Sequence, residues 1–257
     1  MRGLMEKYKS MIFYLKYLQN LLLGMKYKLN RVFHEKFLFK LASKENVFTS
    51  IWSRNYWGSG ESLSGPGSTL EQTANIRNKM PVMFENLGIK SVFDAPCGDM
   101  HWMQHLLENA KFNYLGGDIV SGIVMANKSK FANKRISFTK FDITSDDFPT
   151  SDVWLCRAVF FHLSNHDIYL SLEQFASSNI KYLLTTNCIT NDRHVNLDIV
   201  TGDWRSLNLL LYPFNFPRDF LWEIEDCLPP HPRMTLTLWT KAQIESILPD
   251  LRKVFKK

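Results

Sequence analysis

Three aspartates stand where apolar runs of the sequence end. Asp94, Asp118 and Asp142 each close a stretch that is typical of a buried strand. A carboxylate can accept hydrogen bonds from ribose hydroxyls, and a second one can bind the amino group of an adenine. In a parallel sheet the carboxyl ends of the strands meet at one edge, where ligands bind. The three acids therefore predict a nucleoside site across these strand ends.

The turn after the first of these strands is short and built from small residues. It spans residues 94–99 and contains Gly98, which lets the chain of a ligand pass close to the backbone. No G-x-G-x-x-G follows the strand, and Pro96-Cys97 stands where a dinucleotide's pyrophosphate needs bare backbone, so a dehydrogenase site is disfavoured. The glycine-rich stretch 57–67 lacks the lysine of a P-loop, which excludes that motif.

A histidine follows the fourth expected strand, within residues 160–164. An imidazole with a pKa of ~6.5 suits proton removal near neutral pH. His162 is therefore the candidate general base for a hydroxyl acceptor. The alternative is a histidine that only hydrogen-bonds the helix start at Ser164-Asn165.

A long irregular segment, residues 188–220, follows the fifth expected strand. Loops above ~15 residues in a compact domain are usually functional or disordered. This loop is rich in aromatic residues, and a face such as that of Trp204 suits the C–H surface of a sugar ring. Asp198 and Arg205 complete the predicted catalytic set with His162, because their side chains can hydrogen-bond acceptor hydroxyls.

Two groups of residues have side chains that can bind a metal. Asp192, His194 and Asp198 offer carboxylate and imidazole ligands that suit a divalent ion, although their irregular spacing favours an acceptor-binding or capping role. His101 and His105 are four residues apart, but no glutamate completes an H-E-x-x-H motif. Ordinary surface histidines are predicted there, and the sequence leaves a divalent metal open.

The stretches that carry these residues alternate between strand and helix patterns. Five strands are expected, at residues 91–94, 112–118, 136–142, 152–157 and 182–187. Helices are expected after the first strand, through Leu107, and after the second, from Ser121. This alternation predicts an α/β domain with a doubly wound, mainly parallel sheet.

A further helix is expected after the glycine- and serine-rich loop of residues 57–67. Ser68-Thr69-Leu70-Glu71 has the S-x-x-E spacing of a capping box, with Ser68 as the N-cap. Apolar residues then recur at helical spacing as far as Leu87, which predicts about five turns. The loop itself is either a structural turn or a lid over a ligand.

Composition limits the class of protein. The chain has 257 residues, of which 45% are hydrophobic and 22% charged, so it can bury a core and is not a disordered chain. Its 4 cysteines form no C-x-x-C pair, which excludes a disulfide framework or a zinc ribbon as the organising principle. Reduced thiols and a cytoplasmic location are expected.

The positive charge is confined to the N-terminal part. Residues 1–45 hold ten basic and three acidic residues, a net charge of +7, whereas the whole chain carries +6, so the rest sums to −1. The body thus lacks the charge of a general nucleic-acid binder. We expect a basic amphipathic helical extension at residues 1–50 and one domain at residues 51–257. The extension either packs on protein or lies peripherally on an anionic membrane, since its apolar runs are too short to span one.

The stretch at residues 94–99, Asp-Ala-Pro-Cys-Gly-Asp, resembles motif I of class I S-adenosylmethionine-dependent methyltransferases. The resemblance covers about residues 52–240 and implies a Rossmann-like methyltransferase fold with a seven-stranded, mainly parallel sheet. It also implies S-adenosylmethionine as cofactor. By this resemblance the methionine end of the cofactor contacts Asp94, Cys97, Gly98 and Asp99. The ribose contacts Asp118 with Ile119, and the adenine contacts Asp142 with Ile143. Trp57 and Arg157 complete the set.

Residues 56–69 and 198–217 resemble a methyltransferase subgroup that often occurs beside or fused to glycosyltransferases in glycan-building systems. This implies O-methylation of a sugar hydroxyl in a glycan or polysaccharide, with a glycosyltransferase or an anionic membrane surface as partner of residues 1–45. The chain departs from the subgroup at Ala158, where relatives tend to carry an acid. Two alternatives stay open: a nucleic-acid methyltransferase, which the near-neutral body disfavours, and a cofactor-binding scaffold that lost catalysis at Ala158.

Overall fold

The computed structural model describes residues 38–257 apart from 192, 230 and 257. Contacts divide the chain into two units, Met1–Ala42 and Ser43–Lys257. The helices predicted over residues 1–37 lie outside the described residues. Strands β1 to β7 and helices α2 to α7 all belong to the second unit.

A seven-stranded sheet forms the centre of the second unit, in the order β3-β2-β1-β4-β5-β7-β6. Its strands are β1 (Ser91–Asp94), β2 (Asn113–Asp118), β3 (Ile136–Lys140), β4 (Val153–Cys156), β5 (Tyr182–Cys188), β6 (Trp222–Asp226) and β7 (Met234–Thr240). Strands β1 to β5 run parallel, and β7 is antiparallel to both of its neighbours. The predicted doubly wound, mainly parallel sheet of seven strands is confirmed, and β6 and β7 are the strands that the sequence pattern did not locate.

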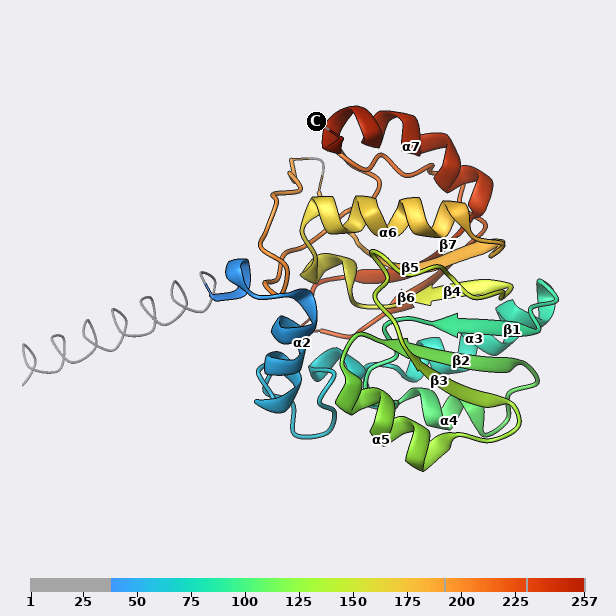
Figure 1. Ribbon diagram of the computed structural model, residues 1–257. Helices are drawn as coiled ribbons and strands as arrows, with labels where there is room; N and C mark the ends of the chain where they lie inside the picture. The colour runs from blue at the N-terminus through green and yellow to red at the C-terminus, as the bar shows by residue number, and fades with distance from the viewer. Residues whose placement is uncertain (1–37, 192, 230, 257) are drawn as a thin grey trace, which may run out of the picture. The chain divides into compact units, whose positions relative to one another are not determined.

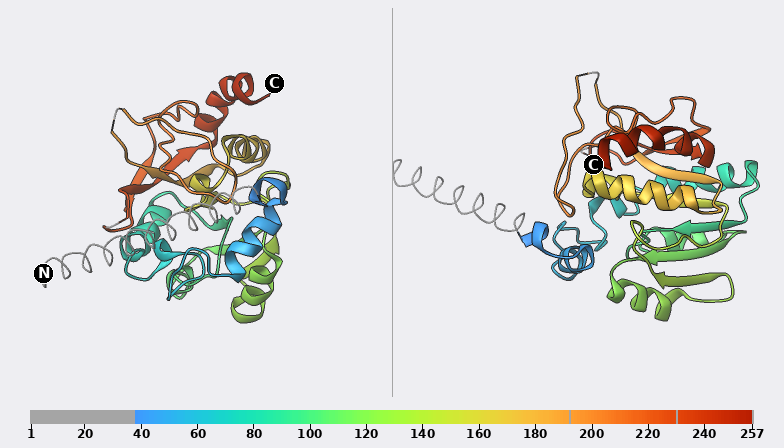
Figure 2. Two further views of the ribbon diagram at one scale, coloured as in Figure 1. Left: turned by 90° about the vertical axis from the view of Figure 1, so that its left-hand side faces the viewer. Right: turned by 45° about the horizontal axis from the view of Figure 1, so that its top comes forward.

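Helices cover both faces of the sheet (Figure 1). The helices of this unit are α2 (Lys44–Ser53), α3 (Ala74–Asn86), α4 (Met103–Leu107), α5 (Ser121–Phe131), α6 (Asn165–Ser177) and α7 (Lys241–Phe255), with the short 3-10 helices η1 (Pro66–Ser68) and η2 (Phe160–His162). Helices α6 and α7 lie on one face, and α3, α4 and α5 on the other; the two further views in Figure 2 show the same layers. The result is a three-layer α/β arrangement.

Strand β4 shows how the sequence builds this interior. All four of its residues are buried, as expected of a parallel strand with helices on both faces. Trp154 belongs to the apolar cluster that includes residues of α6 and α7, whereas Val153 and Leu155 belong to the cluster that includes residues of α3 and α4. Alternate side chains of one strand thus join the sheet to both helical layers.

The capping box predicted at Ser68 is wrong, because α3 begins at Ala74 with Thr73 as its N-cap. Other side chains take the backbone groups of the intervening residues: Glu61 accepts from the amide of Leu70 at 2.7 Å, and Thr73 donates to the carbonyl of Thr69 at 2.8 Å. Ser68 instead closes η1. The helix has 13 residues rather than about five turns, and its predicted apolar face is buried.

Two strands end earlier than predicted. Strand β3 ends at Lys140, so Asp142 lies in the turn beyond it, and β4 ends at Cys156, so Arg157 lies just after it. Asp94 and Asp118 are the last residues of β1 and β2, as predicted. The three acids still reach the same edge of the sheet, because β3, β2 and β1 are neighbours.

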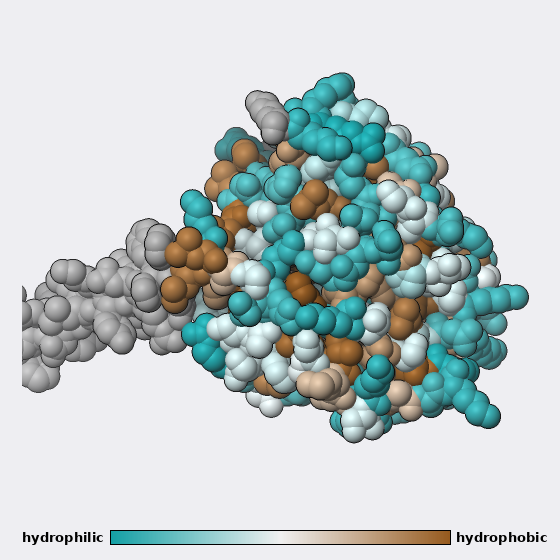
Figure 3. Space-filling model, viewed as in Figure 1, coloured by the Kyte–Doolittle hydropathy of each residue, from teal (hydrophilic) through white to brown (hydrophobic). Residues whose placement is uncertain are grey.

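The surface over α7 is largely hydrophilic in the space-filling view (Figure 3). Its apolar residues Ile244, Leu248 and Leu251 are buried, and the helix contacts α6 and β7. Among the described residues of 38–257, no helix is both long enough and apolar enough to cross a membrane.

Candidate functional site

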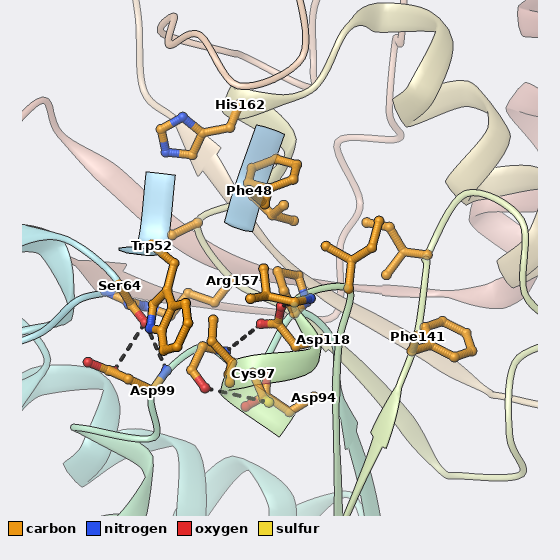
Figure 4. A pocket seen from close by; sticks show the side chains of 18 of the residues that line it. Phe48, Trp52, Ser64, Asp94, Cys97, Asp99, Asp118, Phe141, Arg157 and His162 are labelled. Atoms are coloured by element: carbon orange, nitrogen blue, oxygen red, sulfur yellow. Dashed lines mark hydrogen bonds between the residues drawn. The ribbon is translucent and has the colours of Figure 1, made fainter. Parts of the chain in front are cut away.

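A cavity that is partly open to solvent lies at the carboxyl ends of β1, β2 and β4. Every residue predicted to contact the cofactor lines it, together with the predicted base: Trp57, Asp94, Cys97, Gly98, Asp99, Asp118, Ile119, Asp142, Ile143, Arg157 and His162. Figure 4 shows how the side chains from these separate elements converge.

The carboxylate of Asp118 organises the turn after β1. Its Oδ2 accepts a hydrogen bond from the amide of Gly98 at 3.1 Å, and its Oδ1 accepts one from the amide of Val120 at 2.9 Å. Burial raises the pKa of Asp118 to about 6, although these backbone hydrogen bonds act in the opposite direction. Each oxygen keeps a lone pair for a further donor, so the group can still bind a ligand hydroxyl.

Asp94 is more deeply enclosed, with 3% of its surface exposed. The hydroxyl of Tyr114 donates to its Oδ2 at 2.6 Å. Burial raises the pKa of Asp94 to about 7, against the effect of this hydrogen bond and of Arg157. A cation placed in the cavity would favour the ionised form of this carboxyl.

The loop of residues 59–65 is tied to the first turn by Asp99. This carboxylate accepts hydrogen bonds from the hydroxyls of Ser62 and Ser64 and from the amide of Leu63 at 2.7 Å. Ser64 in turn accepts from the amide of Asp99 at 2.9 Å. Leu63 and Ser64 line the cavity, so the loop forms one of its walls.

Gly98 has a left-handed backbone, with φ of 58°. A Cβ at this position would collide with the hydroxyl oxygen of Ser64. Both facts require glycine, the first because left-handed φ is costly for other residues and the second because there is no space. The small residue predicted for close approach is therefore also needed to seat the loop.

Asp142 and Ile143 lie in the turn after β3. Oδ1 of Asp142 accepts from the amide and the hydroxyl of Thr144, at 2.9 and 2.7 Å. Its Oδ2 lies 3.4 Å from the ammonium of Lys44 in α2. The carboxylate is thus fixed in place at the end of the cavity reached by α2.

Arg157 is neutralised by a residue that the sequence did not single out. Its guanidinium forms two hydrogen bonds with the carboxylate of Asp226, at 2.8 and 2.9 Å, and both side chains are almost fully buried. The same group donates to the carbonyl of Gly67 and stacks over the ring of Trp102, 5.3 Å from its centroid. Arg157 therefore shapes the cavity without leaving a bare charge in it.

Ala158 lines the cavity next to Arg157. Its backbone is left-handed, with φ of 58°, and its amide donates to the hydroxyl of Thr186 at 2.9 Å. The methyl side chain offers no carboxylate on this wall.

His162 is oriented by the backbone of the segment that follows Gly202. Its Nδ1 lies 2.8 Å from the carbonyl oxygen of Asp203, and since a carbonyl only accepts, Nδ1 carries the proton. The other ring nitrogen, Nε2, is then an acceptor. The ring lies against Trp57, with centroids 4.9 Å apart. Burial, with the charge of Arg205, lowers the pKa of His162 to about 4.

Asp198 and Arg205 hold the start of α6 and are not among the residues that line the cavity. Oδ1 of Asp198 accepts from the amide of Asn165 at 2.7 Å. Arg205 donates to the carbonyl of Leu163 and to Oδ1 of Asn165, at 2.6 and 2.9 Å. These residues thus fix the chain just after His162, and the helix start does not use the imidazole.

No cluster of three potential metal ligands occurs within the part of the chain that the structure describes. His101 bonds Glu61 at 2.7 Å, and His105 lies 3.4 Å from Glu108. His194 lies 3.2 Å from the carbonyl oxygen of Ser206. Asp192 lies outside the described residues.

The sequence did not point to α2, although Lys44, Phe48 and Trp52 line the cavity. They are spaced by four residues and therefore share one face of the helix. Their spacing was visible, but it is also that of an ordinary amphipathic helix, so nothing in the sequence distinguished this use.

Solved structures share the fold of this chain, whereas no protein-family model and no curated protein matches its sequence. One is the 1,6-didemethyltoxoflavin-N1-methyltransferase of Burkholderia thailandensis, which was solved with bound 1,6-didemethyltoxoflavin and S-adenosylhomocysteine. It matches with a TM-score of 0.55 and 13% sequence identity, and the match covers 76% of this chain and 86% of that one. Another is human N-acetylserotonin methyltransferase in complex with S-adenosylmethionine. It matches with a TM-score of 0.53 and 15% sequence identity, and the match covers 77% of this chain and 60% of that one. At these identities the likeness establishes the fold.

Proposed function

We propose that this protein is an S-adenosylmethionine-dependent O-methyltransferase that acts on a sugar hydroxyl of a glycan or polysaccharide. The observation that carries the proposal is the convergence of Asp94, Asp118 and Asp142 on one cavity at the carboxyl ends of a doubly wound sheet. The Burkholderia and human proteins of the same fold were solved with S-adenosylmethionine or its demethylated product.

The residues present fit this cofactor. Asp118 retains acceptor capacity for ribose hydroxyls, and Asp142 lies at the end expected to hold the adenine. Gly98 lines the cavity at the turn after β1, but its amide already donates to Asp118 and its carbonyl accepts from Asn127, so it offers the methionine portion a surface and not a free hydrogen-bonding group. Asp94 offers a carboxyl whose ionisation the cofactor's positive charge would favour. When bound, the cofactor supplies an electrophilic methyl group on a sulfonium.

His162 supplies the proton acceptor in this proposal. Its proton is held at Nδ1 by the carbonyl of Asp203, so Nε2 is free to take the proton of an acceptor hydroxyl as the new O–CH₃ bond forms. A pKa of about 4 keeps the imidazole neutral at physiological pH, but makes it a weaker base than the imidazole of ordinary pKa from which the sequence argument started. The nearby Arg157 is paired with Asp226, so the wall of the site suits an uncharged acceptor.

The sugar assignment is supported by aromatic residues around His162. Trp57 packs on the imidazole, and Trp204, which is half exposed, lies 6.5 Å from Phe161, centroid to centroid. Aromatic faces suit the apolar face of a sugar ring, while its hydroxyls stay solvated or bonded to polar groups. We propose that Trp57 and Trp204 flank the acceptor.

The test is transfer of an isotopically labelled methyl group to a panel of neutral oligosaccharides, with RNA as a competing acceptor. We expect transfer to an oligosaccharide, and we expect His162→Gln to lower kcat by ~10²–10⁴-fold, the usual contribution of a general base. Its affinity for the cofactor should stay within about twofold of wild type, since the base does not hold the cofactor in this proposal. His105→Gln, on the exposed side of α4, is the matched control and should behave as wild type.

Three outcomes would contradict the proposal in different ways. Labelling of RNA alone would favour the nucleic-acid methyltransferase. Cofactor binding with no turnover on any acceptor would favour the scaffold that lost catalysis at Ala158. Unchanged turnover in His162→Gln would remove this histidine as the base.

A further inference from the structure

Helix α2 is fastened to the cavity by two charged residues in its first turn. Glu45 accepts hydrogen bonds from Ser121, at the start of α5, at 3.2 Å and from Lys140, at the end of β3, at 2.7 Å. Lys44, the residue before Glu45, bonds the hydroxyl of Thr144 and lies 3.4 Å from Asp142 and 3.7 Å from Asp167. One turn of helix thus bridges three separate elements.

The same helix forms a wall of the cavity. Phe48 and Trp52 follow Lys44 at four-residue spacing and line the same space as Asp118 and His162 (Figure 4). The ring of Trp52 packs closely on Gly122 of α5, where a Cβ would come within 2.7 Å of it. Docking of α2 therefore decides how enclosed the proposed cofactor site is.

Lys44 also reaches the segment that orients His162. Its partner Asp167 accepts from the hydroxyl of Thr201 at 2.5 Å, and Thr201 accepts from the amide of Ser164 at 2.9 Å. Directly after Thr201, the amide of Gly202 donates to the carbonyl of His162 at 2.8 Å. The carbonyl of Asp203, next in the chain, binds the imidazole.

The network therefore joins the two ends of the site through one ammonium group. On one side is Asp142, which we expect at the adenine; on the other is the turn at residues 201–203, which fixes the tautomer of His162. Without Lys44, Asp142 and Asp167 would lose their shared cation and keep only neutral donors, Thr144 and Thr201, whose hydrogen bonds hold a carboxylate less firmly than a charged partner does.

We propose that Lys44 is a positioning residue that couples occupation of the cofactor pocket to the orientation of His162. A ligand that packs beneath Phe48 and Trp52 and binds Asp142 stabilises the docked α2. The docked helix keeps Lys44 on Asp167, and Asp167 holds the Thr201 turn against η2. This inference rests on the proposed function for the identity of the ligand, but not for the link between Lys44 and His162.

The experiment follows the NMR titration of the His162 imidazole in the ligand-free protein, assigned with His162→Gln. In wild type it should stay neutral below pH 5, in line with its pKa of about 4. In Lys44→Met we expect a looser, more hydrated imidazole whose pKa rises toward the ordinary value of ~6.5. The affinity for S-adenosylhomocysteine should fall about tenfold, a usual size for coupling between sites. Lys44→Arg keeps the cation and should titrate close to wild type.

Two further variants separate coupling from direct charge effects and from simple loosening of α2. The charges acting on the imidazole are those of Arg205 and Asp203. Asp167→Ala removes a negative charge, which would lower the pKa of His162 if it acted directly; coupling predicts a rise, as in Lys44→Met. Lys140→Met breaks the other anchor of α2, the pair with Glu45, and should weaken ligand binding but move the titration of His162 less than Lys44→Met does, because the contact of Lys44 with Asp167 remains.

The results that would overturn the inference are specific. An unmoved His162 titration in Lys44→Met, a fall in pKa in Asp167→Ala, or an equal shift in Lys140→Met would each show that Lys44 has no dedicated link to the base. Failure of the wild type to bind S-adenosylhomocysteine would instead defeat the proposed function. The titration of the ligand-free protein would still decide the link between Lys44 and His162.

Discussion

Two carboxyl groups at the centre of the site are buried without a cation bound directly to them. Asp94 is bonded by a tyrosine hydroxyl and Asp118 by backbone amides. Burial raises their pKa values to about 7 and about 6. A protein that only had to be stable would gain by replacing such groups, so their presence is best explained by the ligand they bind.

This gives a prediction for the dependence of stability on pH. The pKa of Asp94 is about 7 in the folded protein against 3.8 for the free side chain, so its contribution is fully favourable below pH 3.8 and is lost as the pH rises through 7. The full shift corresponds to roughly 4 kcal/mol. Asp94→Asn lacks this titration. Between pH 5 and pH 8, the free energy of unfolding of Asp94→Asn, measured with urea, should therefore rise by about 3 kcal/mol relative to that of the wild type.

Asp152 is a control, because its pKa is shifted in the opposite direction to that of Asp94. Its partial burial favours the neutral acid, but hydrogen bonds from Lys90, Ser91 and Lys181 prevail and hold its pKa below the ordinary value. Asp152→Asn should therefore be less stable than wild type at neutral pH, and the difference should shrink as the pH falls. Equal pH dependence of unfolding in wild type and Asp94→Asn would contradict the assignment of Asp94 as a strained carboxyl.

The sequence was sufficient to predict the positions of some of these site residues in the fold, but not of others. Asp94 and Asp118 could be placed because a strand pattern and its last residue are local features. Asp226 and Lys44 could not, since their partners Arg157 and Asp142 lie far away in the chain and meet them only through the fold. The role of Asp198 at the start of α6 was likewise hidden, because the amide of Asn165 that it binds is 33 residues away.

At the scale of elements, the turn between β1 and α4 is the most constrained part of the site. Gly98 combines a left-handed backbone with contact to Ser64, and Asp99 binds the loop of residues 59–65. A change in this turn should therefore disturb the loop wall as well as the cofactor contact.

Gly98→Ala tests this directly. The left-handed conformation alone costs ~1–2 kcal/mol for a non-glycine residue, and the collision with Ser64 adds to it. We expect the free energy of unfolding to fall by at least about 2 kcal/mol, measured by urea denaturation. Gly60→Ala, where an added Cβ meets no atom within 4 Å, should change it by less than ~0.5 kcal/mol. Equal effects of the two substitutions would contradict the proposed geometry.

The error at the start of α3 has an instructive cause. The S-x-x-E pattern at residues 68–71 is a local signal for a capping box, but the amide of Leu70 is taken by Glu61 and the hydroxyl of Thr73 turns back to Thr69. Long-range contacts of the loop thus replace the local cap. By contrast, α5 begins at Ser121 as predicted, because it follows directly from a strand end.

At the scale of the whole molecule, the alternation of strands and helices was sufficient to predict the sheet, and the observed order confirms it. The strands that were missed, β6 and β7, follow a long irregular segment that obscured their pattern. The substrate is a different matter, since proteins of this fold act on chemically diverse acceptors and the fold alone does not select among them. The proposed sugar acceptor therefore depends on the side chains that surround His162 in the cavity.

The proposed function depends above all on the binding of an adenosyl cofactor by the acids at the strand ends. Calorimetric titration of the full chain with S-adenosylhomocysteine decides this, alongside Asp118→Asn and the surface control Asp147→Asn. We predict micromolar binding by wild type and by the control, and at least tenfold weaker binding by Asp118→Asn, since a charged hydrogen bond to a ribose hydroxyl contributes about 1.5–3 kcal/mol. No binding by wild type, or equal binding by Asp118→Asn, would show that these acids do not form a cofactor site.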